Sequence, residues 1–438
     1  MSQNDYPVAV IGAGPVGLAA AAHLLSRGLT PIVFEAGDRA GASINEWGHV
    51  RMFSPWQFNV DKEAERLLTA NGWTAPQSDV YPTGQELLAQ YIQPLSKLPE
   101  IEPHLYLNSR ILAVSRAEHD VMKTQGRNTT PFLLRVAGAD GEHDVLASAV
   151  IDASGTYTTP NWMGANGIPA LGEKENSAHI AYGIPDVLGR ARQRYSGRRV
   201  LVVGAGHSAF NALQDLVELA HIAPATRVIW AIRGTSLERI LGGGENDQLE
   251  QRGVLGLKIR QLLADGAIEL HQGIRIHSIV ASPEGLIVHG KEQALPPVDE
   301  IIVATGFRPN LELLAELRLA LDPATGSPVE LAPLIDPNEH SCGTVRPHGV
   351  QELAHPEEGV FITGMKSYGR APTFLMLTGY EQVRSVAAAL AGDWDSARRS
   401  ELVLPETGVC RTQFIDPIEQ PACCRPATAC SSASTQEA

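Results

Sequence analysis

The chain has 438 residues, 44% hydrophobic and 19% charged, a composition typical of a globular protein with two or three domains rather than a disordered one. Its formal net charge of -14 argues against nucleic acid or an anionic membrane surface as the main partner. No apolar run is long enough to span a membrane, and the first residues lack the basic and apolar regions of a signal peptide, so we expect a cytoplasmic protein.

The N-terminal segment carries a dinucleotide-binding fingerprint. An apolar stretch at 8–11 predicts a strand, and a helix-compatible run follows the glycine turn. The fingerprint residues are Gly12, Gly14, Pro15 and Gly17. The three glycines permit a tight turn, a close approach of backbone to a pyrophosphate, and close packing of helix on strand. A second predicted strand at 31–34 ends in Glu35, where a carboxylate can bond a ribose hydroxyl.

Aromatic and polar side chains gather at residues 47–56. In a dinucleotide-binding domain this position lies beside the ring end of the cofactor. Arg51 and Ser54 are therefore candidate site residues by position, and Arg51 is placed to meet cofactor phosphates or a hydride donor. Two interpretations of Trp47 and Trp56 stay open, one in which they wall the site and one in which they only pack.

The middle of the chain contains two similar strand-to-glycine turns. After a mainly helical stretch at 61–98, short strands between 105 and 150 predict a small antiparallel β meander. The strand at 149–152 then leads to Gly155. Its counterpart is a strand at 300–303, which enters Ala304, Thr305 and Gly306. Paired turns on either side of an intervening segment indicate a second domain inserted into the first.

The intervening segment has a fingerprint of its own. A strand at 199–203 is followed by Gly204, Gly206, His207 and Ser208, and alanine takes the last small position. The next strand leads to Arg233 rather than to an acid. An acid there would repel a 2′-phosphate, whereas an arginine can pair with it, so the pattern favours NADPH over NADH. His207 is interpreted as a loop residue near the cofactor, because hydride transfer needs no base.

The last third adds a late glycine block and a polar tail. A strand near 360 ends at Gly364, and Thr373 can cap a helix from about 374 to 390 whose amide end faces a bound ring. Lys366 lies between them and is a third catalytic candidate by position alone. The predicted domains are 1–158 and 299–400 for the two parts of the first domain, 159–298 for the inserted domain, and 401–438 for a flexible cysteine-containing tail.

The two fingerprints, the Ala-Ser-Gly and Ala-Thr-Gly turns and the late glycine block together resemble the flavin-containing monooxygenase-like flavoproteins over about residues 6–392. The resemblance implies an α/β fold of two Rossmann-like domains, with the NADPH domain inserted into the FAD domain. It also implies a monooxygenase in which the reduced flavin forms a C4a-hydroperoxide with dioxygen and oxygenates a small-molecule substrate. Gly172, His179 and Tyr182 match the family's intervening signature loosely, and Met365 stands where many related flavoproteins have aspartate.

A narrower resemblance lies in the blocks 334–345, 364–373 and 404–410, which look like flavoproteins encoded with bacterial arsenic-resistance genes. It implies a trivalent arsenical, arsenite or methylarsenite, oxidised to the pentavalent form. Arsenic(III) is a soft centre that prefers thiolates. The candidate substrate ligands are Cys342, Cys410, Cys423 and Cys424, which Cys430 could assist. For Cys342, a role as a small buried hydrophobe is the open alternative.

Other functions stay open at this point. They are monooxygenation of a sulfur or nitrogen compound, thiol or disulfide reduction by the C-terminal cysteine pair, and metalloid binding without turnover. A disulfide reductase usually has its redox cysteines soon after the first fingerprint, and residues 37–56 contain none. All five cysteines lie at or after Cys342, which indicates thiol chemistry in a reducing compartment. No compact zinc-ligand pattern occurs, so no metal is predicted.

Overall fold

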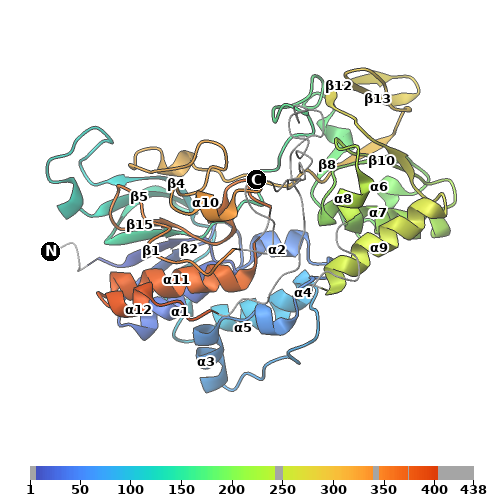
Figure 1. Cartoon of the computed structure of the whole chain (residues 1–438). Coiled ribbons are helices and arrows are strands. Elements are labelled where there is room, and N and C mark those ends of the chain that lie inside the picture. Colours follow the sequence, from blue (N-terminus) through green and yellow to red (C-terminus); the bar gives the residue numbers. More distant parts are fainter. Residues whose placement is uncertain (1–5, 242–249, 339–344, 373, 403–438) are drawn as a thin grey trace, which may run out of the picture.

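The computed structural model describes residues 6–241, 250–338, 345–372 and 374–402, which form two α/β domains side by side (Figure 1). The first domain is built on a parallel sheet of order β15-β7-β1-β2-β3. Its strands are β1 (Val8–Ile11), β2 (Pro31–Phe34), β3 (Leu105–Tyr106), β7 (Ala149–Asp152) and β15 (Val360–Ile362). The edge strand β15 pairs with β7 although the whole second domain separates them in sequence.

Alternate side chains of the first sheet face different layers, as the two-residue period of a strand requires. Val8 and Val10 share a core with the helices, whereas Ala9 and Ile11 pack with the antiparallel meander on the other face. The helices of this domain are α1 (Pro15–Ser26), α2 (Ala42–Glu46), α3 (Lys62–Ala70), α4 (Gly84–Leu87), α5 (Gln93–Ser96), α10 (Ala332–Ile335), α11 (Met376–Leu390) and α12 (Trp394–Arg398), with a π-helical turn at Leu88–Ile92. The meander is β4 (Arg110–Arg116), β5 (Phe132–Gly138) and β6 (Gly141–Ala147).

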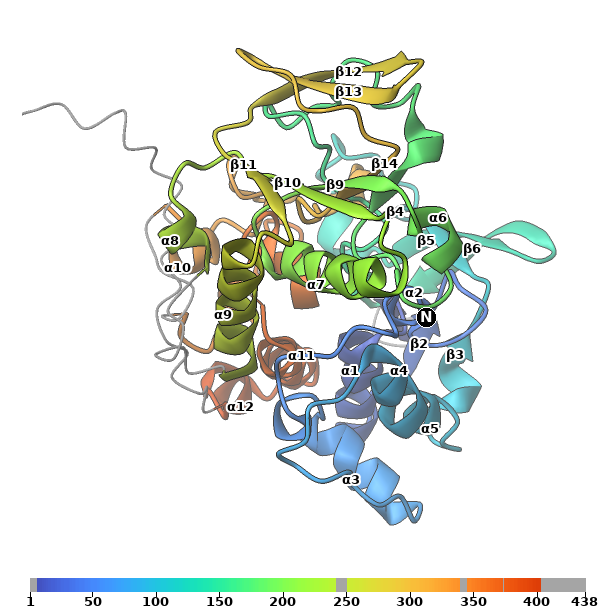
Figure 2. The ribbon, with the colours of Figure 1, turned by 90° about the vertical axis from the view of Figure 1, so that its right-hand side faces the viewer.

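The second domain repeats this plan. Its parallel sheet has the order β11-β10-β9-β14-β8. The strands are β8 (Ile180–Tyr182), β9 (Arg199–Val203), β10 (Arg227–Ala231), β11 (Glu269–His271) and β14 (Glu300–Val303). The helices are α6 (Arg192–Tyr195), α7 (His207–Ile222), α8 (Leu237–Leu241) and α9 (Glu250–Ala264). The sheet lies between α7 and α9 on one side and the hairpin β12 (Ile276–Ser282)–β13 (Gly285–Gly290) on the other (Figure 2).

The two Rossmann-like domains, the insertion of one into the other and the antiparallel meander confirm the predicted fold class. The predicted boundary at residue 299 is wrong by one strand. Strand β14 pairs with β9 and β8 inside the second sheet, so the second domain extends through Val303. A short apolar strand looks the same whichever sheet it joins, because its membership depends on hydrogen bonds to residues far away in sequence.

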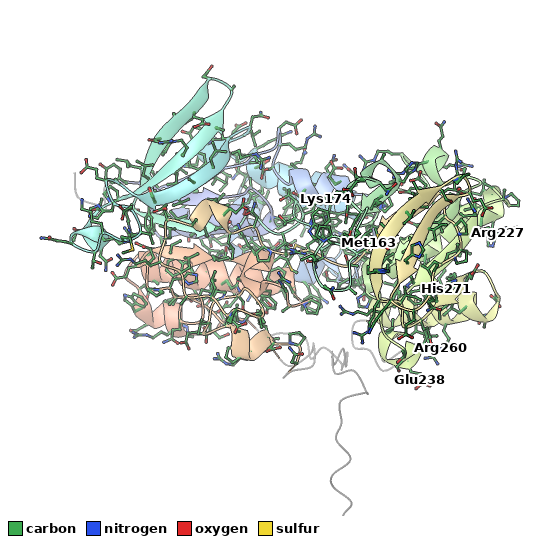
Figure 3. All side chains as sticks on the ribbon, turned by 90° about the horizontal axis from the view of Figure 1, so that it is seen from above. Met163, Lys174, Arg227, Glu238, Arg260 and His271 are labelled. Carbon is green, nitrogen blue, oxygen red and sulfur yellow. The ribbon has the colours of Figure 1, made fainter. Side chains whose placement is uncertain are left out.

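The view from above separates the domain junction from the outer part of the second domain. Met163 and Lys174 lie near the junction, and Arg227, Glu238, Arg260 and His271 lie beyond it (Figure 3). Within the described ranges, every helix is too short or too polar to cross a membrane.

Candidate functional site

The loop that joins β1 to α1, residues 12–17, forms what we call the first cradle. Gly12 has φ +97°, and a Cβ there would lie 2.8 Å from the Cα atom of Ser154. A Cβ at Gly17 would lie 1.9 Å from the carbonyl oxygen of Gly12, so the helix approaches its strand closely. At Gly14, by contrast, a Cβ would meet no described atom within 4 Å. The turn is closed by backbone on one side and open on the other, which fits a pyrophosphate.

The helix behind this cradle presents free amide groups to the open side. Helix α1 begins at Pro15 after Gly14, and no side chain of the described residues caps it. The first amides of an uncapped helix and its positive dipole end together favour a phosphate.

Glu35 follows β2 and holds the first cradle from the side. Its carboxylate accepts hydrogen bonds from the backbone N–H of Ala13 at 2.9 Å and of Gly37 at 2.8 Å. The side chain is therefore fixed at the edge of the cradle, and its contact with a ribose stays a prediction.

The second cradle, residues 204–209, has the same design. Gly204 has φ +138°, and a Cβ there would lie 2.3 Å from the carbonyl oxygen of Ala304. A Cβ at Gly206 would meet no described atom within 4 Å. Helix α7 begins at His207 without a side-chain cap among the described residues. The second turn, at Ala304, Thr305 and Gly306, thus supports the second cradle as Ser154 supports the first.

The strand register places Arg233 one residue beyond the position of Glu35. Phe34 pairs with the last residue of β1, and Ala231 pairs with the last residue of β9. The counterpart of Glu35 is therefore Ile232, which is buried. Arg233 follows it and is exposed.

The late glycine turn, the 3₁₀ helix η9 (Gly364–Tyr368), is held by buried polar groups. The Nζ atom of Lys366 lies 2.6 Å from Oδ2 of Asp152 and 3.0 Å from Oγ of Ser154. Lys366 is 1% exposed and Asp152 is fully buried. This catalytic candidate is thus engaged in an ion pair that ties η9 to the end of β7. Gly155 follows, with φ +70° and open space where its Cβ would be.

A second set of bonds fixes Gly364, whose φ is +66°. Its N–H donates to Oε1 of Gln382 on α11 at 2.8 Å. The amide nitrogen of Gln382 lies 3.0 Å from Nε2 of His348 and 2.9 Å from Oγ of Ser367. Burial lowers the pKa of His348, so the neutral ring accepts from Gln382. Nothing in the sequence of α11 signals this role of Gln382, whereas the acid at the end of the apolar strand 149–152 was a visible signal for Asp152.

The segment 47–56 divides into an exposed and a buried part. Arg51 is exposed, and its Nη1 donates to the carbonyl oxygen of Tyr81 at 2.5 Å. Ser54 is buried and donates to Oδ1 of Asn59 at 2.8 Å. Trp56 is 3% exposed in the main core of the first domain, as the packing interpretation expects for this residue.

The same segment touches the second cradle. The ring centroids of Phe53 and His207 are 5.7 Å apart. The guanidinium of Arg190 donates to the carbonyl oxygen of Glu46 at 3.1 Å across the same junction. Burial lowers the pKa of His49, and its charged neighbours, Asp186 and Arg190, belong to the second domain. The start of α7 therefore lies against the segment that the sequence places at the cofactor ring end.

Several predicted site residues lie outside the described part of the chain. They are Thr373, Cys342, Cys410, Cys423 and Cys424. Among the residues that are described, no three His, Cys, Asp or Glu side chains are grouped to hold a metal ion.

Comparison with known proteins identifies relatives over much of the chain. The profile of the family described as pyridine nucleotide-disulphide oxidoreductase matches residues 9–332. A flavin-containing monooxygenase, FMO GS-OX3 of Arabidopsis thaliana, is 25% identical over 244 residues, which are 50% of this chain and 49% of that protein. The chain spans about half the length of the flavin-containing monooxygenases of this type that it matches.

Two solved structures share the fold over nearly their full lengths. Bacillithiol disulfide reductase from Bacillus cereus superimposes with a TM-score of 0.64 at 20% identity, covering 88% of this chain and 99% of that one. The FAD-bound cadaverine monooxygenase DfoA from Erwinia amylovora gives a TM-score of 0.61 at 16% identity, with 92% and 99% covered.

Proposed function

We propose that this chain, which belongs to the pyridine nucleotide-disulphide oxidoreductase family, is an FAD- and NADPH-dependent monooxygenase of the flavin-containing monooxygenase type. The observation that carries this proposal is the arrangement of the two cradles. Each is open at its second glycine, and His207 of the second cradle, where α7 begins, contacts Phe53 of the first domain. Two dinucleotides bound in this way have their reactive ends at one junction.

The protein's own contribution is binding, orientation and exclusion of water. The backbone N–H groups of Gly14, Val16 and Gly17 at the start of α1 would hold the FAD phosphates, and Glu35 would lie beside the ribose. The amides at the start of α7 would hold the NADPH pyrophosphate, and Arg233 would pair with its 2′-phosphate. FAD would supply the redox chemistry, as the acceptor of the NADPH hydride and the source of the electrons that activate dioxygen.

The substrate we propose is a trivalent arsenical, arsenite or methylarsenite. Support comes from the resemblance of blocks 334–345, 364–373 and 404–410 to flavoproteins of arsenic resistance, and from the four cysteines Cys342, Cys410, Cys423 and Cys424 in and beyond these blocks. The arsenic lone pair accepts one oxygen atom of dioxygen, the other oxygen leaves as water, and NADPH supplies two electrons. Thiolates suit this soft centre as ligands.

The test is NADPH oxidation and dioxygen uptake by the purified, FAD-loaded protein with arsenite, methylarsenite, an alkylamine and a thiol. We expect the arsenicals to increase NADPH oxidation and dioxygen uptake by equal amounts, and we expect the pentavalent arsenical to accumulate as the product. Turnover with the amine or thiol alone would replace the arsenical by a nitrogen or sulfur substrate. NADPH oxidation with a disulfide in the absence of dioxygen would show a reductase instead, and arsenical binding without NADPH consumption would show a carrier.

Cysteine variants test the thiolate part separately. We expect Cys342→Ser and Cys423→Ser to raise the KM for the arsenical while the FAD content is unchanged. An unchanged KM in both variants would remove these thiolates from the proposal.

A further inference from the structure

The two cradles differ at the position of their third small residue. In the first cradle this residue is Gly17, and a Cβ there would lie only 1.9 Å from the carbonyl oxygen of Gly12. In the second cradle it is Ala209, which has a Cβ and is fully buried. The Cβ of Ala209 prevents the close contact that Gly17 makes with the carbonyl of Gly12, so the carbonyl of Gly204 has different neighbours.

The new partner of this carbonyl is Trp230. Its indole N–H, from strand β10, donates to the carbonyl oxygen of Gly204 at 2.7 Å. The side chain is fully buried, and its ring meets Phe210 edge-on at 6.0 Å. A buried indole N–H needs an acceptor, and the carbonyl of the half-buried Gly204 provides it.

This bond sets the direction of the next amide. In a planar trans peptide the C=O and the N–H point to opposite sides. Because the carbonyl of Gly204 points inward to Trp230, the N–H of Ala205 points outward, where Ala205 and Gly206 are exposed.

The first cradle holds the corresponding peptide by its other end. There the N–H of Ala13 donates to the carboxylate of Glu35. The second cradle has Ile232 at the position of that acid, so the amide of Ala205 lacks the equivalent acceptor and its peptide is anchored through the carbonyl instead.

We propose that Trp230 is a positioning residue for the nicotinamide dinucleotide, because it orients the Gly204–Ala205 peptide so that its N–H is available to the pyrophosphate. The inference rests on the proposed function of the second cradle as the NADPH site. It explains how a cradle without an acid at its edge stays ordered before the ligand binds.

Replacing Trp230 by benzothienylalanine removes only the indole N–H, because sulfur takes its place and the ring shape is kept. Trp230→Phe is the simpler variant, but it also shrinks a fully buried side chain. With FAD-loaded protein, we expect the dissociation constant for NADP⁺, measured by calorimetry, and the KM for NADPH to rise about 10-fold, with kcat and FAD affinity unchanged. In the ligand-free protein, the order parameter of the Ala205 amide, measured by NMR relaxation, should fall, because its peptide is no longer anchored through the carbonyl.

Phe210→Leu is the matched control, because it loosens packing on the same indole and leaves the N–H in place. We expect this variant to keep the NADP⁺ affinity of the unmodified protein. An unchanged NADP⁺ affinity with benzothienylalanine, or an equal loss in Phe210→Leu, would overturn the role of Trp230. If the unmodified protein itself fails to bind NADP⁺, the proposed function of the second cradle falls, while the order parameter of the Ala205 amide still reports on the anchor.

Discussion

Replacing Lys366 by methionine should unfold the first domain more easily without changing its chemistry directly. The ammonium lies 2.6 Å from Asp152, and both side chains are almost entirely buried. Removing one partner of such a pair costs about 3–5 kcal/mol, because the other charge stays buried and unpaired. The carboxylate of Asp152 still accepts two hydrogen bonds, from the N–H and the Oγ hydroxyl of Ser154, so we expect a loss near the lower end of that range.

The assay is thermal unfolding, followed by circular dichroism and by flavin fluorescence. A loss of about 3 kcal/mol lowers the melting temperature by roughly 6–12 °C in a domain of this size. The double variant Asp152→Asn/Lys366→Met removes both charges and should recover most of the stability. FAD affinity should likewise fall in Lys366→Met and recover in the double variant, because Ser154, which bonds to both Lys366 and Asp152, supports Gly12 in the first cradle. A single variant with unchanged melting temperature but no turnover would refute this reasoning and make Lys366 a catalytic residue.

Three further substitutions distinguish effects on cofactor binding from effects on the stability of the fold. Gly14→Val should lower the FAD content at least about 10-fold, as the flavin absorbance of the purified variant would show. The stability of the apoprotein should change little, because the added side chain enters only the open side of the first cradle. Arg233→Ser should reduce the preference for NADPH over NADH by about 10–100-fold in kcat/KM, the usual worth of a hydrogen bond to a charged group. Burial raises the pKa of Asp215 to about 6, so the stability that its protonated form contributes is present below about pH 4 and lost as the pH rises through 6. Asp215→Asn should therefore be more stable than the unmodified protein by up to about 3 kcal/mol at pH 7 and no more stable at pH 4, as urea unfolding at the two pH values would show.

The cradles were predictable from sequence because their information is local. A glycine with positive φ, an open second glycine and an uncapped helix start all lie within a few residues of one another, and the observed turns at Gly12 and Gly204 follow that pattern. The sheet membership of β14 was not predictable, because it depends on pairing with β9 about a hundred positions earlier.

Individual side-chain roles were harder still. Position in the chain made Lys366 a catalytic candidate, but only the fold reveals the buried Asp152 opposite it. The indole N–H of Trp230 donates to a carbonyl in the loop after β9, whereas a tryptophan in an apolar strand predicts only burial. Even Arg233 required the strand register to show that Ile232 takes the place of the acid.

The position of β15 has a consequence for biosynthesis. Because this strand completes the first sheet only at residues 360–362, the N-terminal segments leave the ribosome long before their last partner does. The second domain is continuous in sequence through Val303 and has its own core, so it can fold as a unit while the first domain waits. We therefore expect the first domain to bind FAD only late in synthesis, when Lys366 and the turn around it reach the end of β7.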